Sequence, residues 1–126
     1  MRQLVYRSIT TASSGLAADD CAAIAKGAYV RNGIDGISGL LFADGDTFVQ
    51  AIEGEDGAVE ALVARLKVDP RHGELDVLID RIITVRDFGG WSMACRERGE
   101  HAADFAQRLR GLLSGVSPDI ARHFEV

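Results

Sequence analysis

Residues 36–54, GISGLLFADGDTFVQAIEG, constrain the fold more than any other segment of the chain. Two apolar runs flank Asp44-Gly45, a pair typical of a two-residue turn between antiparallel strands. With this turn, the expected cross-strand pairs are Ala43 with Asp46, Leu41 with Phe48, Gly39 with Gln50 and Ile37 with Ile52. The segment therefore predicts a β-hairpin whose register is set by its turn.

Gln50 is the residue of this hairpin that most needs an explanation. Side chains alternate along a strand, so Phe48, Gln50 and Ile52 lie on one face, which is otherwise apolar. A buried amide without hydrogen-bond partners is unfavourable. Gly39, expected opposite Gln50, leaves room beside it. We therefore expect another group to satisfy the amide, which makes Gln50 a candidate functional residue.

The hairpin is preceded by a predicted strand and helix and followed by a second helix. Residues 3–9 are rich in β-formers and predict a strand. Two acidic residues at 19–20 suit a helix start, and Asn32-Gly33 supplies the expected stop. Residues 56–68 predict an amphipathic helix. Asp69-Pro70 ends it, because the residue before proline disfavours the helical conformation.

The remaining segments complete an α+β pattern. Residues 74–88 predict a long strand and residues 89–97 another, after a glycine turn. Residues 101–113 form an amphipathic pattern, and residues 118–124 indicate a short further helical turn. The order β-α-β-β-α-β-β, followed by helices, is that of a ferredoxin-like sandwich with two helices across one face of a mixed sheet.

This order divides the chain into a sheet-forming part, residues 1–97, and a C-terminal helical extension, residues 98–126. The far face of the predicted sheet is apolar and needs a cover. Its residues are Leu40, Phe42, Val49 and Ala51. We therefore expect the helical extension to pack on this face.

The composition argues against several classes of function. The net charge of −5 has no basic stripe through which nucleic acid would bind. The apolar runs are too short to cross a bilayer, and the first ten residues lack the apolar stretch of a secretory signal. The two cysteines, Cys21 and Cys95, are far apart and show no metal-ligand spacing. We expect free thiols, a reducing cytoplasm and no metal site.

Other candidate residues have ordinary structural explanations when each is taken alone. Tyr6 suits a core aromatic residue with a hydrogen-bonded hydroxyl, and Asn32 suits a helix C-terminus. Trp91 and Met93 are two apart on a predicted strand and would share a packing face. Arg71-His72 suits a solvated loop after the second helix.

No residues form a recognisable catalytic set. The histidines, His72, His101 and His123, fall in no nucleophile or metal-binding motif, and there is no P-loop or GxGxxG. Asp76 and Asp80 share a predicted strand, on a face expected to be solvated. A hydrolase of the acylphosphatase kind would need an arginine in the loop after the first strand, and TTASSGLAADD has none. We therefore expect no enzymatic turnover.

Five segments taken together carry a more specific signal. They are, in order, LVYRS, RNGIDGISGLL, FVQAIEG, DPRHGEL and FGGWSM. From about residue 3 to residue 95 the chain resembles the BLUF family of flavin-binding blue-light photoreceptors. The segments fall at matching intervals, apart from a slightly longer loop after the first strand.

The resemblance implies roles for individual residues. Tyr6 stands where the family has its light-oxidised tyrosine, and Gln50 where it has the switching glutamine. Asn32 matches the asparagine that hydrogen-bonds the polar edge of the flavin ring, and Arg31 beside it can reach the same edge. An amide has a donor end and an acceptor end, so rotation or tautomerisation of Gln50 would reverse its hydrogen bonds.

Further residues transfer less directly. Asp69, Arg71 and His72 fall near the ribityl-phosphate end of the flavin, and Trp91 and Met93 match the pair proposed to relay the signal. The helix and strand patterns themselves predict an apolar wall for the ring made by Ile24, Ala25, Ala28, Ile37 and Phe48.

The resemblance implies a photoreceptor that holds FAD non-covalently, with FMN and riboflavin left open. The implied signal is proton-coupled electron transfer from Tyr6 and hydrogen-bond switching at Gln50, read through residues 98–126 by a homo-oligomer or an unidentified protein partner. Val49, where an aromatic residue is frequent, and the ending WSMAC depart from the family pattern and bear on signal relay. The alternative is a ferredoxin-like small-molecule binding or interaction module without photochemistry, which predicts a colourless protein.

Overall fold

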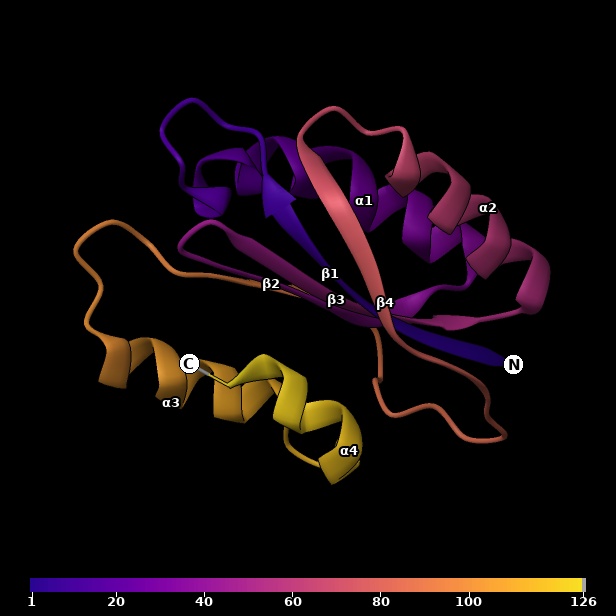
Figure 1. Ribbon diagram of the computed structural model, residues 1–126. Coiled ribbons are helices and arrows are strands. Elements are labelled where there is room, and N and C mark those ends of the chain that lie inside the picture. The colour runs from indigo at the N-terminus through magenta and orange to yellow at the C-terminus, as the bar shows by residue number, and fades with distance from the viewer. Residues whose placement is uncertain (126) are drawn as a thin grey trace.

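A five-stranded sheet forms the centre of the computed structural model, which describes residues 1–125 (Figure 1). The strands are β1 (Arg2–Thr10), β2 (Ser38–Asp44), β3 (Thr47–Gly54), β4 (His72–Ile82) and β5 (Trp91–Cys95). They lie in the order β4-β1-β3-β2-β5. Strands β2 and β5 are parallel, and the other neighbours are antiparallel. The predicted ferredoxin-like α+β fold is confirmed.

Helices cover both faces of the sheet (Figure 1). One face carries α1 (Cys21–Asp35), which follows a 3₁₀ turn at Ala17–Asp20, and α2 (Asp56–Lys67). The other face carries α3 (Ala102–Leu112), α4 (Pro118–Ala121) and a 3₁₀ turn at Arg122–Phe124. The helices that follow β5 thus lie on the face opposite α1 and α2 (Figure 1).

The tail-side face of the sheet is closed by an apolar core. Its buried members from the sheet are Val5, Leu40, Phe42, Val49, Ala51 and Ala94, and from the tail Phe105, Leu109, Ile120 and Phe124. Phe42 and Phe105 approach with ring centroids 5.6 Å apart. Burying one large apolar side chain stabilises a fold by about 1.5–3 kcal/mol, so this cluster holds the tail firmly.

The hairpin forms, but its register differs from the prediction. Asp44 pairs with Thr47, so the two turn residues are Gly45 and Asp46. Gly45 has φ +58°, and glycine tolerates this positive value at the first turn position. The pairing moves by two residues, which leaves every side chain on its predicted face.

Gln50 consequently faces Leu41 and not Gly39. Gly39 faces Ile52 and serves a different purpose, because a Cβ there would lie 1.9 Å from the carbonyl oxygen of Ala51. The expected space beside Gln50 is therefore not supplied by glycine. Gly39 instead permits close approach of two backbones.

Helix α1 continues past its predicted stop at Asn32-Gly33 and ends after Asp35. Gly36 supplies the left-handed C-terminal cap, with φ +68° and its N–H bonded to the carbonyls of Asn32 and Gly33. The predicted stop at Asn32-Gly33 was wrong, because Gly36 adopts the left-handed conformation that ends the helix. Asn32 lies inside the helix, which buries its side chain.

The loop between β4 and β5 folds over a buried carboxylate, Glu53. The backbone N–H groups of Asp87 and Phe88 donate to it at 3.0 and 2.8 Å. Asp87 in turn accepts from the backbone N–H and the hydroxyl of Ser117, both at 3.0 Å. The strand predicted to reach Phe88 ends at Ile82. The backbone N–H groups of Asp87 and Phe88 bond to the side chain of Glu53 and not to the backbone of a neighbouring strand.

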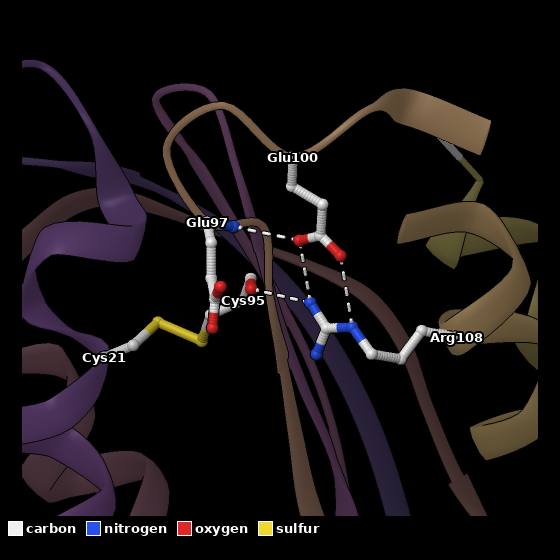
Figure 2. Close-up of a disulfide and its surroundings, with 5 residues drawn as sticks. All are labelled: Cys21, Cys95, Glu97, Glu100 and Arg108. Carbon is white, nitrogen blue, oxygen red and sulfur yellow. Dashed lines mark hydrogen bonds and ion pairs between the residues drawn. A yellow bond between two sulfur atoms is a disulfide. The ribbon is translucent and has the colours of Figure 1, made fainter. Parts of the chain in front are cut away.

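The expectation of free thiols is wrong. Cys21 and Cys95 form a disulfide, with Cα atoms 6.6 Å apart (Figure 2). The first residue of α1 lies against the last residue of β5, a proximity that a separation of 74 residues gave no means to predict. Within residues 1–125, no helix has the length and apolar character needed to cross a membrane.

Candidate functional site

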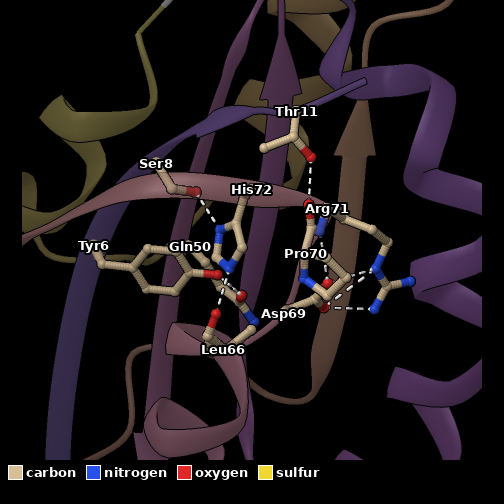
Figure 3. A network of polar contacts seen from close by, with 9 residues as sticks. All are labelled: Tyr6, Ser8, Thr11, Gln50, Leu66, Asp69, Pro70, Arg71 and His72. Carbon is tan, nitrogen blue, oxygen red and sulfur yellow. Dashed lines mark hydrogen bonds and ion pairs between the residues drawn. The ribbon is translucent and has the colours of Figure 1, made fainter. Parts of the chain in front are cut away.

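The site is centred on Tyr6 and Gln50, which lie directly opposite each other on β1 and β3. The Tyr6 hydroxyl donates a hydrogen bond of 2.6 Å to Oε1 of Gln50 (Figure 3). The two residues are 2% and 4% exposed. The phenol thus satisfies one end of the amide whose position on an apolar face required an explanation.

The environment keeps Tyr6 protonated. Burial raises the pKa of its phenol well above the ordinary value, and the negative charge of Asp69 adds to this effect. A neutral phenol is a hydrogen-bond donor, so Oε1 of Gln50 accepts. Within residues 1–125 the Gln50 amide nitrogen has no protein acceptor. Its donor end remains available to a group in the adjacent space.

That space is a cavity of about 340 Å³ between α1, α2 and the sheet. Most of the residues predicted for the site border it: Tyr6, Ile24, Ala28, Arg31, Asn32, Phe48, Gln50, Asp69, Arg71, His72 and Trp91. They come from four strands, from α1 and from the loop before β4. The fold therefore gathers residues that are far apart in the sequence around one hollow.

Asn32 is the clearest polar group on the helical side of the cavity. It is 2% exposed, and in the described part of the chain its side-chain amide has no protein partner. Since Asn32 borders the cavity, its amide is available to a ligand with complementary hydrogen-bonding atoms. Arg31, the preceding residue, borders the same cavity and adds a positive charge.

Asp69 and Arg71 form an ion pair near the end of the cavity. Nη2 of Arg71 lies 2.7 Å from Oδ2 of Asp69, and its Nε donates to the same carboxylate. These hydrogen bonds hold the pKa of Asp69 below its usual value. Both residues therefore remain charged at neutral pH and fix the loop that follows α2.

His72 is held through both ring nitrogens. Nε2 lies 2.6 Å from the carbonyl oxygen of Leu66, and Nδ1 lies 2.6 Å from the Ser8 hydroxyl (Figure 3). Because a carbonyl only accepts, Nε2 carries the proton. The ring meets those of Tyr6 and Phe48 edge-on. His72 thus packs beside Tyr6 and ties β4 to the end of α2.

Three of the predicted residues do not border the cavity. Ala25, predicted for the apolar wall, lies instead on the side of α1 that borders a separate hollow. Ile37 lies in the core beneath the helices, with Ile52. Met93 borders a separate hollow next to the disulfide. Trp91 does border the cavity, where its ring meets that of Tyr29 edge-on at 4.9 Å. The structure therefore separates the pair predicted to relay the signal, with Trp91 beside the cavity and Met93 beyond it.

Sequence reasoning missed the contribution of α2 to the cavity wall. Leu62, Arg65 and Leu66 lie along one side of this helix and border the cavity. Arg65 is a charged residue between apolar wall positions, the same type of signal that identified Gln50. Its Nη2 lies 3.6 Å from Oδ2 of Asp35 and is buried without a hydrogen-bond partner in the described residues.

A flavin fits this set of groups. Its ring has an apolar end and a hydrogen-bonding end, and ligand sites of this type combine an apolar wall with a few placed polar groups. Here the apolar wall includes Ile24, Ala28, Leu41, Phe48 and Leu62. The buried amides of Asn32 and Gln50 supply unpaired hydrogen-bonding atoms.

Comparison with known proteins also indicates a flavin-binding chain. Residues 1–94 match the family described as BLUF, sensors of blue light using FAD. The chain is 37% identical over 93 residues to the photoactivated adenylate cyclase subunit alpha of Euglena gracilis, covering 74% of this chain and 9% of that protein. The chain thus spans about a tenth of the length of the curated relatives it matches.

Solved structures give the same result. The dark-state structure of BlrB, a BLUF protein, is 33% identical, with a TM-score of 0.70, over 96% of this chain and 81% of that one. BlrP1 of Klebsiella pneumoniae, in a manganese and cyclic diGMP complex, is 29% identical, with a TM-score of 0.76, over 98% of this chain and 30% of that one. The matched family, the shared fold and the tyrosine–glutamine pair beside a cavity lead to one conclusion: this chain belongs to the BLUF family of flavin-binding blue-light sensors.

Proposed function

We propose that this chain senses blue light through FAD held in the cavity between α1, α2 and the sheet, with Tyr6 and Gln50 as its photochemical residues. The observation that carries the proposal is the buried 2.6 Å hydrogen bond from Tyr6 to Gln50 at the cavity wall. It joins an oxidisable phenol to an amide whose hydrogen bonds are reversible.

FAD supplies light absorption and, in its excited state, a strong one-electron oxidant. Tyr6 is the residue suited to give up an electron, and its proton has a direct route to Oε1 of Gln50. Burial disfavours a free phenolate or a charged radical at this position, which couples loss of the electron to loss of the proton.

Gln50 converts this transfer into a lasting change. In the structure its oxygen accepts from Tyr6, and its nitrogen is left to donate toward the cavity. Rotation or tautomerisation would exchange donor and acceptor at both ends. A glutamate or leucine has no such pair of exchangeable ends, which is why the proposal requires an amide.

The remaining wall residues hold and orient the cofactor. We assign the polar edge of the ring to Asn32 and Arg31, and the ribityl-phosphate end to Asp69, Arg71 and His72. The hydrogen-bonded frame of the last three supports this assignment, because a preformed frame lowers the entropy lost on binding. Ile24, Ala28 and Phe48 supply the apolar wall.

The assignment is tested by absorption spectra of the purified protein before and after blue light. The wild type should be yellow and should shift reversibly to the red on illumination. Gln50→Leu and Tyr6→Phe should keep the yellow colour and lose this shift. Tyr29→Phe, which alters the only other tyrosine, is the matched control and should keep the shift. A normal photoproduct in Tyr6→Phe or Gln50→Leu would refute the assignment.

We further propose that the chain works as a sensor and not by turnover, with residues 1–97 as the flavin-binding part and residues 98–126 as the readout. Trp91 and Met93 lie on β5, and the carbonyl oxygen of Cys95 on the same strand accepts from Nη2 of Arg108 on α3 at 2.9 Å. A change in the position of β5 would therefore reach the tail directly through this hydrogen bond.

The readout is proposed to change contacts with a second copy of the chain or with a protein partner. Light scattering of the full chain in the dark and under blue light tests the first option, since an assembly change should follow illumination and be absent in Gln50→Leu. Deleting residues 98–126 is a poor test, because it would expose the apolar tail-side face around Phe42 and Val49.

A further inference from the structure

The disulfide between Cys21 and Cys95 joins the two elements that matter most to the proposed signal. Cys21 is the first residue of α1, and later turns of this helix border the FAD cavity. Cys95 is the last residue of β5, two positions after Met93 on the same side of the strand. The bond therefore connects the cavity helix to the strand assigned to signal relay.

Solution reductants can approach this bond. Both cysteines border a second hollow of about 800 Å³, whose lining shares no residue with that of the FAD cavity. Cys95 is half-buried, whereas Cys21 is 8% exposed, so Cys95 is the more accessible partner. Three arginines also line the hollow, Arg96, Arg98 and Arg108. Each of them is paired with a carboxylate, Asp44, Asp19 and Glu100 respectively, so the charges around the hollow are balanced and access rests on its size.

The same point of the chain contacts the tail. Nη2 of Arg108 donates to the carbonyl of Cys95 at 2.9 Å and to Oε1 of Glu100 at 3.0 Å (Figure 2). Oε1 of Glu100 also accepts from the backbone N–H of Glu97 at 3.0 Å. One residue, Cys95, is thus bonded covalently to α1 and through a hydrogen bond to α3.

We propose that Cys21–Cys95 is a dithiol-responsive site whose redox state sets how much of a light-driven change in β5 reaches α3. The inference rests on the proposed function, because it takes β5 as the relay strand. With the disulfide intact, the end of β5 is fixed to α1 and its displacement is restricted. With the disulfide reduced, hydrogen bonds to β2 hold this end, including one of 3.0 Å from the N–H of Arg96 to the carbonyl of Ala43.

The chemical step is thiol–disulfide exchange with a dithiol. One thiolate of the reagent attacks a sulfur of the bridge to form a mixed disulfide, and the released cysteine thiolate takes up a proton. The second thiol of the reagent then displaces the other cysteine. In total two electrons and two protons pass to the protein, giving two cysteine thiols and the disulfide of the reagent. Where disulfides form in reducing compartments, they are usually transient and have catalytic or redox-sensing roles.

The test compares the light response of the full chain in its two redox states. The FAD-loaded protein is prepared oxidised, and a second portion is treated with dithiothreitol and desalted without air. The red shift is recorded for both, together with the light-induced change in hydrogen exchange of residues 96–113. We expect equal red shifts and a change in exchange that is larger in the reduced protein by about twofold or more.

A double variant, Cys21→Ser with Cys95→Ser, provides the matched control. It should behave like the reduced wild type and be unaffected by dithiothreitol, which separates bridge reduction from other effects of the reagent. A red shift in both states with identical exchange of residues 96–113 would overturn the redox inference and leave the flavin assignment standing. Two free thiols in the oxidised preparation would also overturn it. Absence of a red shift in either state would instead refute the proposed function, and this inference with it.

Discussion

The two faces of the central sheet differ in how they are completed. On the cavity side, Tyr6 and Gln50 place polar atoms beside a hollow, and the Gln50 nitrogen lacks a protein acceptor in the described chain. On the tail side, Val5 and Val49 pack into a closed apolar core. Val5 precedes Tyr6 on β1, and Val49 precedes Gln50 on β3. Neighbouring residues of one strand therefore face either the cavity with its polar groups or the closed apolar core.

This difference shows how one sheet can serve two purposes. The tail-side face contributes stability by itself, since its apolar surface is covered by α3 and α4. The cavity-side face accepts unpaired polar groups that a ligand must satisfy. Changes on the tail side should therefore affect folding most, and changes on the cavity side should affect the light response most. The following predictions test that division.

The largest effect on stability is expected for Phe105→Ala on the tail side. Phe105 is fully buried against Phe42, and its removal leaves a cavity that the core cannot close. The free energy of unfolding should fall by about 3–5 kcal/mol, measured by urea unfolding. Phe105→Leu should lose clearly less. Equal losses for the two variants would mean that packing does not hold the tail on the sheet.

Removing the disulfide should have the next largest effect. Cys21→Ser with Cys95→Ser frees a long loop in the unfolded chain, and the free energy of unfolding should fall by roughly 2–4 kcal/mol under oxidising conditions. In dithiothreitol the wild type should become as unstable as the variant. An equal urea midpoint for the wild type with and without dithiothreitol would contradict this expectation.

A smaller loss is expected for Tyr6→Phe on the cavity side. The substitution removes the hydroxyl that satisfies Oε1 of Gln50, so the free energy of unfolding should fall by about 1–3 kcal/mol. Adding Gln50→Leu removes the orphaned amide as well and should recover part of that loss. Urea unfolding of the single and double variants without FAD measures this, and additive losses would contradict it. Both variants should lose the red shift.

The smallest effect is expected from the Asp69–Arg71 ion pair, which is partly exposed and therefore screened. Because the folded-state pKa of Asp69 is lowered, the pair stabilises the fold above the ordinary carboxyl pKa. The contribution disappears as pH falls through the folded-state value. Asp69→Asn should lose about 1 kcal/mol or less at neutral pH, and its unfolding free energy should converge with the wild type in acid.

The faces of the hairpin were predictable, whereas its register was not. Alternation assigns Gln50 and Val49 to opposite faces, and a shift of two residues leaves that assignment intact. The choice between two turns around Gly45 depends on backbone conformation. The end of α1 depended in the same way on which glycine, Gly33 or Gly36, took the left-handed cap.

The site was only partly visible in the sequence. Gln50 was identified because an amide on an apolar face is unusual, but its contact with Tyr6 was anticipated only through the family resemblance. Periodicity cannot pair residues 44 positions apart, as the hydrogen bond does. The bond between Cys21 and Cys95 depends likewise on proximity in space, which only the assembled fold reveals.

The contact of Asp87 with Ser117 limits how the tail can move. Ser117 precedes α4, and both of its donors are bonded to a side chain in the loop that covers Glu53. Lifting the whole tail would strip these polar bonds and wet the apolar layer beneath α3 at the same time. A displacement that begins at Arg108 on α3 avoids the first of these losses. If the tail is the readout, as proposed, we expect a light-driven change to be a rotation of α3 about the Ser117 contact and not release of the whole tail.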